Sequence, residues 1–200
     1  MKSIAMPLLL ALFVTMGILD VAFAEEKKPF APNVNMDTGA ISVPEDYYLW
    51  PTLGTWSHSK VDDEGAAVIH EYHVVYTQPA TIEYYKKKRR FPDGAVLVKE
   101  LLHAESMSMT TGPVVGHGTT LKGFFVLVRD TKGRFKSSAL WGDGWGWSLF
   151  NPDDLKKTVS KNYKIDCIPC HTPALDLAPR NAKKDDKWIY TLGYPVFREK

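Results

Sequence analysis

Apolar and polar residues alternate over much of the chain, and this pattern predicts a fold built mainly from β-strands. A period of two places successive side chains on opposite faces of a sheet. The predicted strands cover residues 70–78, 94–104, 121–130, 134–141 and 144–150. A turn at residues 130–133, with the sequence Asp-Thr-Lys-Gly, is expected to join two of these strands.

Two helices are predicted before and between the first strands. Residues 44–50 are compatible with a short helix, because Pro44 suits its first turn. Thr81 can cap a helix that continues through residues 82–90, and the Pro-Asp-Gly sequence at 92–94 is expected to end it.

A third helix is predicted after the last strand. Residues 151–154 read Asn-Pro-Asp-Asp, which provides a capping side chain, a proline at the first helical position and acids in the first turn. We expect this helix to run through residues 155–163, towards the two cysteines. Strands with interspersed helices predict an α+β fold with a mainly antiparallel sheet.

Residues 1–24 have the pattern of a secretory signal peptide. Lys2 precedes an almost wholly apolar stretch at residues 6–18, and Ala-Phe-Ala at 22–24 is a small-x-small cleavage site. The apolar stretch is too short for a membrane span. We therefore expect cleavage after Ala24 and a mature protein that functions outside the cytoplasm.

The remaining chain has the length and composition of one domain. Residues 25–40 lack periodicity and predict a loose N-terminal arm, which leaves residues 41–200 for a single domain. The formal net charge is +2 at pH 7 with neutral histidines, so composition indicates neither nucleic acid nor an anionic membrane as a partner. The basic run at 86–90 is expected to be a solvated helix end, which could dock an acidic electron-transfer partner.

One residue departs from the alternation in the strand predicted at 94–104. Lys99 shares a face with Leu97 and Leu101, and an unpaired ammonium on a buried face costs several kcal/mol. If that face is in water, the two leucines are exposed instead. Full burial lowers the pKa of a lysine by up to about 3–5 units, so a neutral amine becomes accessible.

The only two cysteines lie in Cys167-Ile168-Pro169-Cys170-His171, which is the attachment signature of a c-type haem. Two thiols one helical turn apart can bond the two vinyl groups, and the adjacent imidazole can ligate the iron. The alternatives are a structural disulfide and a redox pair, but a redox pair usually follows a strand in a βαβ unit. Zinc would need further ligands at matching spacing. We expect one covalently bound haem c, which also agrees with export to a bacterial periplasm.

The sequence offers no clear second axial ligand for the iron. Met107 and Met109 are the only methionines beyond the N-terminal arm, and both are expected on the surface. Five scattered histidines are each more typical of ordinary strand or loop positions: His58, His70, His73, His103 and His117. His70 and His73 would point to opposite faces of a strand, so a second metal there is not expected. An open sixth position predicts ligand chemistry at the iron.

The mature chain resembles the cytochrome P-460 family and its relatives, the cytochromes c′-β, which are β-rich and carry a late CxxCH. The matching stretches, in chain order, are Tyr48-Leu49-Trp50, Gly54-Thr55, Val75-Tyr76, Pro79, Phe91-x-Asp93-Gly94, Val98-Lys99-Glu100-Leu101, residues 123–130, the CIPCH sequence, Asn181-Ala182-Lys183 and Tyr194-Pro195-Val196-x-Arg198. The stretch at 93–101 and the ending at 194–198 are the most specific of them.

This resemblance implies a periplasmic haem enzyme, typically a homodimer, that oxidises hydroxylamine and carries out nitric oxide chemistry at the same iron. Electrons would pass to a small cytochrome. The resemblance also implies an extra covalent bond between a lysine and a meso carbon of the porphyrin, and Lys99 occupies the position of that lysine. Cytochromes c′-β share the fold but bind nitric oxide or carbon monoxide in a pocket capped by aromatic side chains.

The chain departs from the family pattern on the distal side of the expected haem. Phe125 occupies, to within one residue, the position of a carboxylate that would relay protons from hydroxylamine. Phenylalanine would instead favour small apolar ligands such as NO or CO, or simply belong to the core. His73 falls near a distal arginine and could hydrogen-bond a ligand or relay a proton. Asp130 matches an aspartate of the family, although an acid in a turn is an ordinary feature.

Two hypotheses about function follow. In the first, Lys99 is cross-linked to the haem and the protein oxidises hydroxylamine. In the second, the protein is not an enzyme and binds NO or CO for scavenging or sensing. Lys99 favours the first hypothesis and Phe125 favours the second; we favour the first. A plain electron-transfer cytochrome ranks third because it needs a sixth protein ligand.

Overall fold

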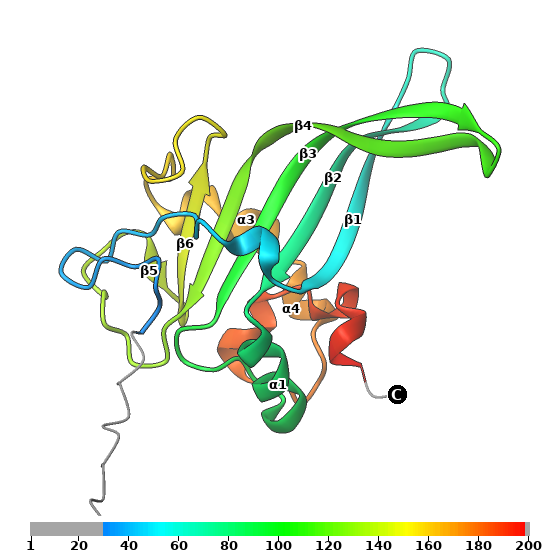
Figure 1. The fold of residues 1–200 in the computed structure, drawn as a ribbon. Helices are drawn as coiled ribbons and strands as arrows, with labels where there is room; N and C mark the ends of the chain where they lie inside the picture. The colour runs from blue at the N-terminus through cyan, green and yellow to red at the C-terminus, as the bar shows by residue number, and fades with distance from the viewer. Residues whose placement is uncertain (1–29, 199–200) are drawn as a thin grey trace, which may run out of the picture.

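A single antiparallel sheet of six strands dominates the fold, in the order β1-β2-β3-β4-β6-β5. The computed structural model describes residues 30–198, so the expected signal peptide lies outside the described residues. The strands are β1 (Thr52–Val61), β2 (Ala67–Thr77), β3 (Val96–Met109), β4 (Gly112–Arg129), β5 (Trp141–Gly142) and β6 (Trp145–Phe150). Figure 1 shows a curved sheet from which the β3–β4 hairpin projects at one end.

The helices within residues 30–198 are all short and lie outside the sheet. They are α1 (Pro79–Lys88), α2 (Tyr163–Asp166), α3 (Ile168–His171) and α4 (Ala174–Leu177), with the 3₁₀ turns η1 (Tyr47–Leu49), η2 (Lys184–Trp188), η3 (Thr191–Gly193) and η4 (Pro195–Phe197). α1 and the C-terminal segments gather at the end of the sheet opposite the hairpin (Figure 1). This arrangement confirms the expected α+β fold with a mainly antiparallel sheet.

Each face of the sheet supports its own hydrophobic core, as alternation along the strands requires. On β3, Leu97 packs into a core with Trp147, Ile189 and other C-terminal residues. Val96 and Val98 face the other way and pack with residues that precede β1. The C-terminal part of the chain therefore covers one face, and residues before β1 cover part of the other.

The predicted loose arm at residues 25–40 is wrong for residues 30–40, whereas residues 25–29 lie outside the described residues. Ala31 and Val34 are buried in the second core, and Val34 makes a β-bridge with Ile41. The indole Nε1 of Trp141 also donates a 2.8 Å hydrogen bond to the carbonyl of Gly39. Apolar side chains without periodicity can still be held by a preformed sheet surface, which the local pattern does not reveal.

The first predicted helix is reduced to a single turn, and the second is shifted towards the N-terminus. Residues 44–50 give only the 3₁₀ turn η1. α1 begins at Pro79, earlier than expected, and Gln78 rather than Thr81 is its N-cap residue. The Thr81 hydroxyl donates to the Gln78 side chain, whose oxygen also accepts from the backbone of Val96. α1 ends at Lys88 because Arg89 adopts the left-handed conformation, with φ of 53°.

The third predicted helix, at residues 151–163, does not form. This segment instead covers the edge of β6: the Thr158 hydroxyl donates to the Leu149 carbonyl at 2.9 Å, and the Val159 amide donates to the same carbonyl at 2.8 Å. Pairing with an unsatisfied strand edge thus outweighs the local helix signal. A four-residue helix, α2, begins only after Asn162, whose side chain accepts from the Lys164 amide.

The strand predicted at 134–141 is also wrong, because only Trp141–Gly142 pairs with β6. Residues 130–133 therefore do not connect two neighbouring strands of a hairpin. Instead, β3 and β4 pair directly, with Met109 opposite Gly112 at the tip. β4 is longer than expected, since it includes the projecting hairpin as well as residues 121–129.

Candidate functional site

A cavity of about 460 Å³ lies between the sheet and the segment that carries both cysteines. Five strands contribute to its wall: His58 from β1, His73 from β2, Lys99 from β3, Phe125 from β4 and Trp147 from β6. The opposite wall includes Cys167, Cys170 and His171. The fold thus brings the attachment sequence and Lys99 to one cavity, although they are far apart in the chain.

The attachment sequence forms two successive single-turn helices. Cys167 follows α2 and is buried, whereas Cys170 lies within α3 and is exposed; both are free thiols. Burial raises the pKa of the Cys167 thiol to about 11. A helical turn between the two cysteines gives the spacing that a pair of porphyrin vinyl groups requires.

A hydrogen bond and a neighbouring ring fix the orientation of the His171 imidazole. Its Nδ1 atom lies 2.7 Å from the carbonyl oxygen of Trp188. A carbonyl only accepts hydrogen bonds, so Nδ1 carries the proton and Nε2 retains its lone pair. Burial lowers the pKa of His171 to about 4, which keeps the imidazole neutral. The edge-on ring of Trp147, with its centroid 5.0 Å away, further fixes the imidazole plane.

Lys99 reaches the cavity from β3, on the same face as Leu97. Its Nζ atom lies 4.4 Å from the centroid of the Phe125 ring. Within residues 30–198 no carboxylate forms an ion pair with it. Burial lowers the pKa of Lys99, and the thiols of Cys170 and Cys167 and the Glu71 carboxylate oppose this effect. The surroundings therefore favour a neutral amine facing the cavity.

A chain of polar side chains leads away from the cavity wall at His73. His73 Nε2 lies 2.6 Å from Glu71 Oε1, and Lys122 Nζ lies 2.6 Å from Glu71 Oε2. The His58 and His73 rings are close, with centroids 3.9 Å apart. Sequence reasoning considered His73 but missed Glu71 and Lys122. The available signal was the two-residue spacing of Glu71 and His73, which places both on one face of a strand.

Asp130 does not line this cavity. It lies at the end of β4, where its carboxylate accepts from the amides of Lys132 and Gly133, each at 3.0 Å, and from the Arg134 guanidinium at 2.6 Å. The carboxylate is thus occupied in closing a turn, and Asp130 is not one of the distal polar groups. Met107 and Met109 lie exposed on the projecting hairpin, also away from the cavity.

Comparison with known proteins identifies the family. The family model for cytochrome P460 matches residues 44–191 of the chain. The chain belongs to the cytochrome P460 family. A search of curated proteins found no match. Membership implies a haem cofactor, and the matched range includes every residue of the cavity wall named above.

The residues at this cytochrome P460 cavity fit a haem. Two thiols, a neutral imidazole with a free Nε2 and a wide apolar wall are the donor set of a covalently held porphyrin. The Trp188 carbonyl is the outer partner that ligating histidines generally have. In the part of the chain that the structure describes, no cluster of three or more His, Cys, Asp or Glu side chains could hold a metal ion. Iron held here would thus need the porphyrin nitrogens.

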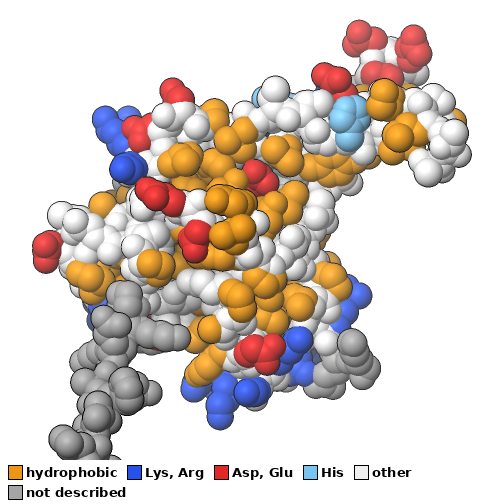
Figure 2. All heavy atoms as spheres, in the orientation of Figure 1, with side chains coloured by type: hydrophobic (Ala, Val, Ile, Leu, Met, Phe, Trp, Pro, Cys, Tyr) orange, Lys and Arg blue, Asp and Glu red, His pale blue; other side chains and the backbone are white. Residues whose placement is uncertain are grey.

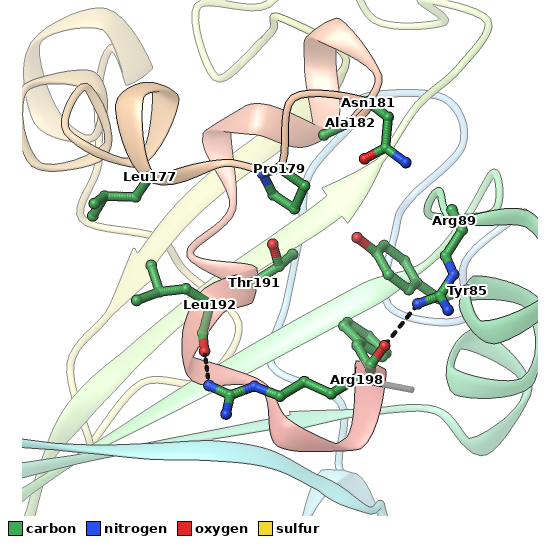
Figure 3. A pocket seen from close by; sticks show the side chains of 10 residues that line it. Tyr85, Arg89, Leu177, Pro179, Asn181, Ala182, Thr191, Leu192 and Arg198 are labelled. Atoms are coloured by element: carbon green, nitrogen blue, oxygen red, sulfur yellow. Dashed lines mark hydrogen bonds between the residues drawn. The ribbon is translucent and has the colours of Figure 1, made fainter. Parts of the chain in front are cut away.

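A second cavity, of about 540 Å³, lies between α1 and the C-terminal segments. Figure 3 shows two arginines at this cavity, and both donate to backbone carbonyls: Arg89 to Phe197 at 2.9 Å and Arg198 to Leu192 at 2.8 Å. It contains neither cysteine nor His171, so it is separate from the haem site.

No helix within the described residues is long and apolar enough to cross a membrane.

Proposed function

We propose that this cytochrome P460 family member is an exported c-type cytochrome that oxidises hydroxylamine, with nitric oxide chemistry at the same iron. Cys167 and Cys170 would form the thioether bonds of one haem c, and His171 would be the axial ligand. The haem, when bound, supplies the redox centre and an iron position for a small ligand. The periplasm is the proposed location because haem attachment to CxxCH is periplasmic chemistry.

Lys99 is the observation that carries the proposal. Its side chain lies in the same cavity as Cys167, Cys170 and His171, and no described carboxylate pairs with it. A lysine held beside apolar side chains costs free energy unless it is neutral or covalently bonded. A bond from Nζ to a porphyrin carbon removes this cost, because the nitrogen then carries no ammonium charge.

The proposed cross-link has a defined chemical balance. With haem bound, the neutral amine of Lys99 would lose an N–H bond, the porphyrin carbon would lose a C–H bond, and an N–C bond would form. Two electrons and two protons would leave, and an oxidant of the peroxide class would accept the electrons. Burial lowers the pKa of Lys99, which favours the nucleophilic free amine that this step would require.

A gas-binding function is the second candidate, and Phe125 favours it. The ring of Phe125 lines the cavity beside Lys99, at the position where the resemblance expects a carboxylate. An apolar ring favours small apolar ligands such as NO and CO over protic hydroxylamine. In this alternative Lys99 stays unmodified and the protein serves in scavenging or sensing.

The absorption spectrum of the purified ferrous holoprotein separates the two functions. A strongly red-shifted Soret band is expected if Lys99 is cross-linked, and an ordinary c-type Soret band would overturn the cross-link. Lys99→Met should return the red-shifted band to the ordinary position and abolish hydroxylamine oxidation. Lys60→Met, at an exposed position of β1, is the matched control and should change neither property.

The proposed partners are a second copy of the chain and a small periplasmic electron-acceptor cytochrome. The projecting hairpin supports a homodimer, because Met107, Met109 and Val114 are all at least half exposed there. Figure 2 shows basic side chains gathered over α1, where residues 86–90 form a basic run suited to an acidic acceptor. Analytical sedimentation tests the dimer, because Val114→Glu should shift the protein towards the monomer. The rate at which the protein reduces an acidic cytochrome tests the docking, because that rate should fall as salt is added.

A further inference from the structure

The polar chain Lys122–Glu71–His73 runs from solvent to the wall of the proposed haem cavity. The side chain of Lys122 is 47% exposed, whereas those of Glu71 and His73 are 9% and 12% exposed. Glu71 lies between the other two, with one carboxylate oxygen 2.6 Å from each nitrogen. Polar groups buried beside an apolar cavity each need a hydrogen-bond partner to offset their desolvation. Such a chain therefore adds little to the stability of the fold.

Hydrogen bonding determines which atom of His73 is free. Burial by itself raises the pKa of Glu71, but the hydrogen bonds from Lys122 and His73 outweigh this effect and lower the pKa to about 2. An ionised carboxylate only accepts, so His73 donates through Nε2–H and keeps a lone pair on Nδ1. The imidazole is thus oriented by a carboxylate, in the manner of a general base.

His73 is also fixed sterically and electrostatically by the strands around it. His58 on β1 lies against its ring, Glu71 lies on the same strand, Lys99 faces it from β3 and Lys122 approaches from β4. Burial, followed by the Lys99 charge, lowers the pKa of His73 to about 4, while Glu71 opposes both effects. The imidazole is therefore neutral near neutral pH and able to accept a proton.

We propose that His73 is the proton acceptor of this cavity and that Glu71 and Lys122 position it there. The inference rests on the proposed haem site, and it assigns to His73 the task that a carboxylate at position 125 would perform. One proton passes from a protic ligand to Nδ1 of His73, which becomes an imidazolium balanced by the Glu71 carboxylate. The imidazolium then releases the proton to solvent. The ligand class is small, protic molecules such as hydroxylamine or hydrogen cyanide.

Another carboxylate at the cavity does not compete for this role. Asp166 lies beside Cys167, and its Oδ2 atom accepts from the amides of Lys161 at 2.7 Å and Asn162 at 2.9 Å. The Asp166 carboxylate thus caps the backbone just before α2, and its Oδ2 atom is already hydrogen-bonded. Lys99 and His171 belong to the proposed haem attachment, which leaves His73 and its neighbour His58 as candidate bases on the described cavity wall; of these two, His73 is the one hydrogen-bonded to a carboxylate.

Cyanide association with the ferric holoprotein tests this inference without relying on hydroxylamine oxidation. Near neutral pH the probe is mainly HCN, which must lose its proton as it binds. Removing a general base costs about 100-fold or more, so His73→Leu should slow cyanide association by about that factor. Carbon monoxide binding to the ferrous protein transfers no proton and should change far less. Equal slowing of both ligands, or no slowing of cyanide, would overturn the proposal.

Glu71 is tested through the pH profile, which a purely structural role would not move. In Glu71→Gln the imidazolium loses its balancing charge, so the pKa of His73 falls and the acid limb of the cyanide rate profile shifts to lower pH. An unchanged profile would contradict the positioning role. His117→Leu, on the exposed hairpin, is the matched control and should match the wild type.

His73→Gln serves as the second variant if His73→Leu loads little haem, because glutamine keeps a donor for Glu71 but cannot act as the base. It should slow cyanide as His73→Leu does, and wild-type cyanide rates would overturn the inference. A failure of hydroxylamine oxidation in the wild type would refute the proposed function, yet the cyanide comparison would still decide the role of His73.

Discussion

The Nζ atom of Lys99 lies 4.4 Å from the centroid of the Phe125 ring, and the two residues are directly paired between β3 and β4. A charged amine over an aromatic ring gains about 0.5–2 kcal/mol, which is less than the several kcal/mol that burial of an unpaired ammonium costs. A carboxylate at position 125 would form an ion pair with the ammonium. Phe125 therefore favours the neutral form of Lys99 more than a carboxylate at the same position would.

Phe125→Glu should raise hydroxylamine turnover of the cross-linked protein by about 10-fold. A second acid–base group would then lie beside the ligand, and such groups contribute about 100-fold when no other is present; the gain is smaller here because His73 already accepts protons. Steady-state oxidation per haem is the measurement. Phe125→Gln, equal in size but not titratable, is the control, and an equal rise in that variant would refute the proton-transfer explanation.

Asp130→Ala should destabilise the protein by about 2–4 kcal/mol without altering the haem site. The carboxylate accepts from the amides of Lys132 and Gly133 and from the Arg134 guanidinium, so its removal leaves several donors unpaired. Urea unfolding measures the loss, and Asp130→Asn should lose less because it keeps one acceptor oxygen. The ferrous spectrum and the turnover per haem should stay at wild-type values. A loss of turnover without a loss of stability would show that Asp130 takes part in the reaction.

The alternation along β3 is enough to predict much of the site from the sequence alone. Lys99 and Leu97 share a face by period alone, and that face does line the cavity. The attachment sequence likewise needs only local geometry, since a single helical turn sets the spacing of Cys167 and Cys170. These features depend on neighbours within a few residues, which is the range over which sequence patterns are informative.

Features that depend on distant pairing are not predictable in the same way. Lys122 reaches Glu71 across β3 at a point where the β3–β4 register shifts, and no local pattern reveals such a bulge. Helix signals at residues 151–154 are overridden because the segment after them pairs with Leu149 on β6. Asp130 resembles a distal group by its match to the family, yet its neighbours in the turn fully account for it.

Acidification should destabilise the wild type more than His73→Gln. With a charged Lys99, the pKa of His73 is about 4 in the folded protein, compared with about 6.5 when unfolded. Between these values the unfolded chain binds a proton that the folded one does not, so stability falls as pH drops from about 6.5 to about 4 and this contribution changes no further below that. The His73 side chain is 12% exposed and therefore partly screened by solvent, so we expect a difference of about 1–2 kcal/mol.

Urea unfolding of both holoproteins at pH 7.5, 5.5 and 4.5 measures this difference, with the Soret band confirming that each sample retains its haem. Glutamine does not titrate, so subtracting the His73→Gln values removes the contributions of groups that do not interact with His73. The Lys99 charge is the second cause of the low pKa of His73, after burial. Cross-linking removes that charge, so a fully cross-linked sample should show a smaller difference than one with free Lys99. A difference that is independent of pH would show that His73 does not titrate in the range its surroundings require.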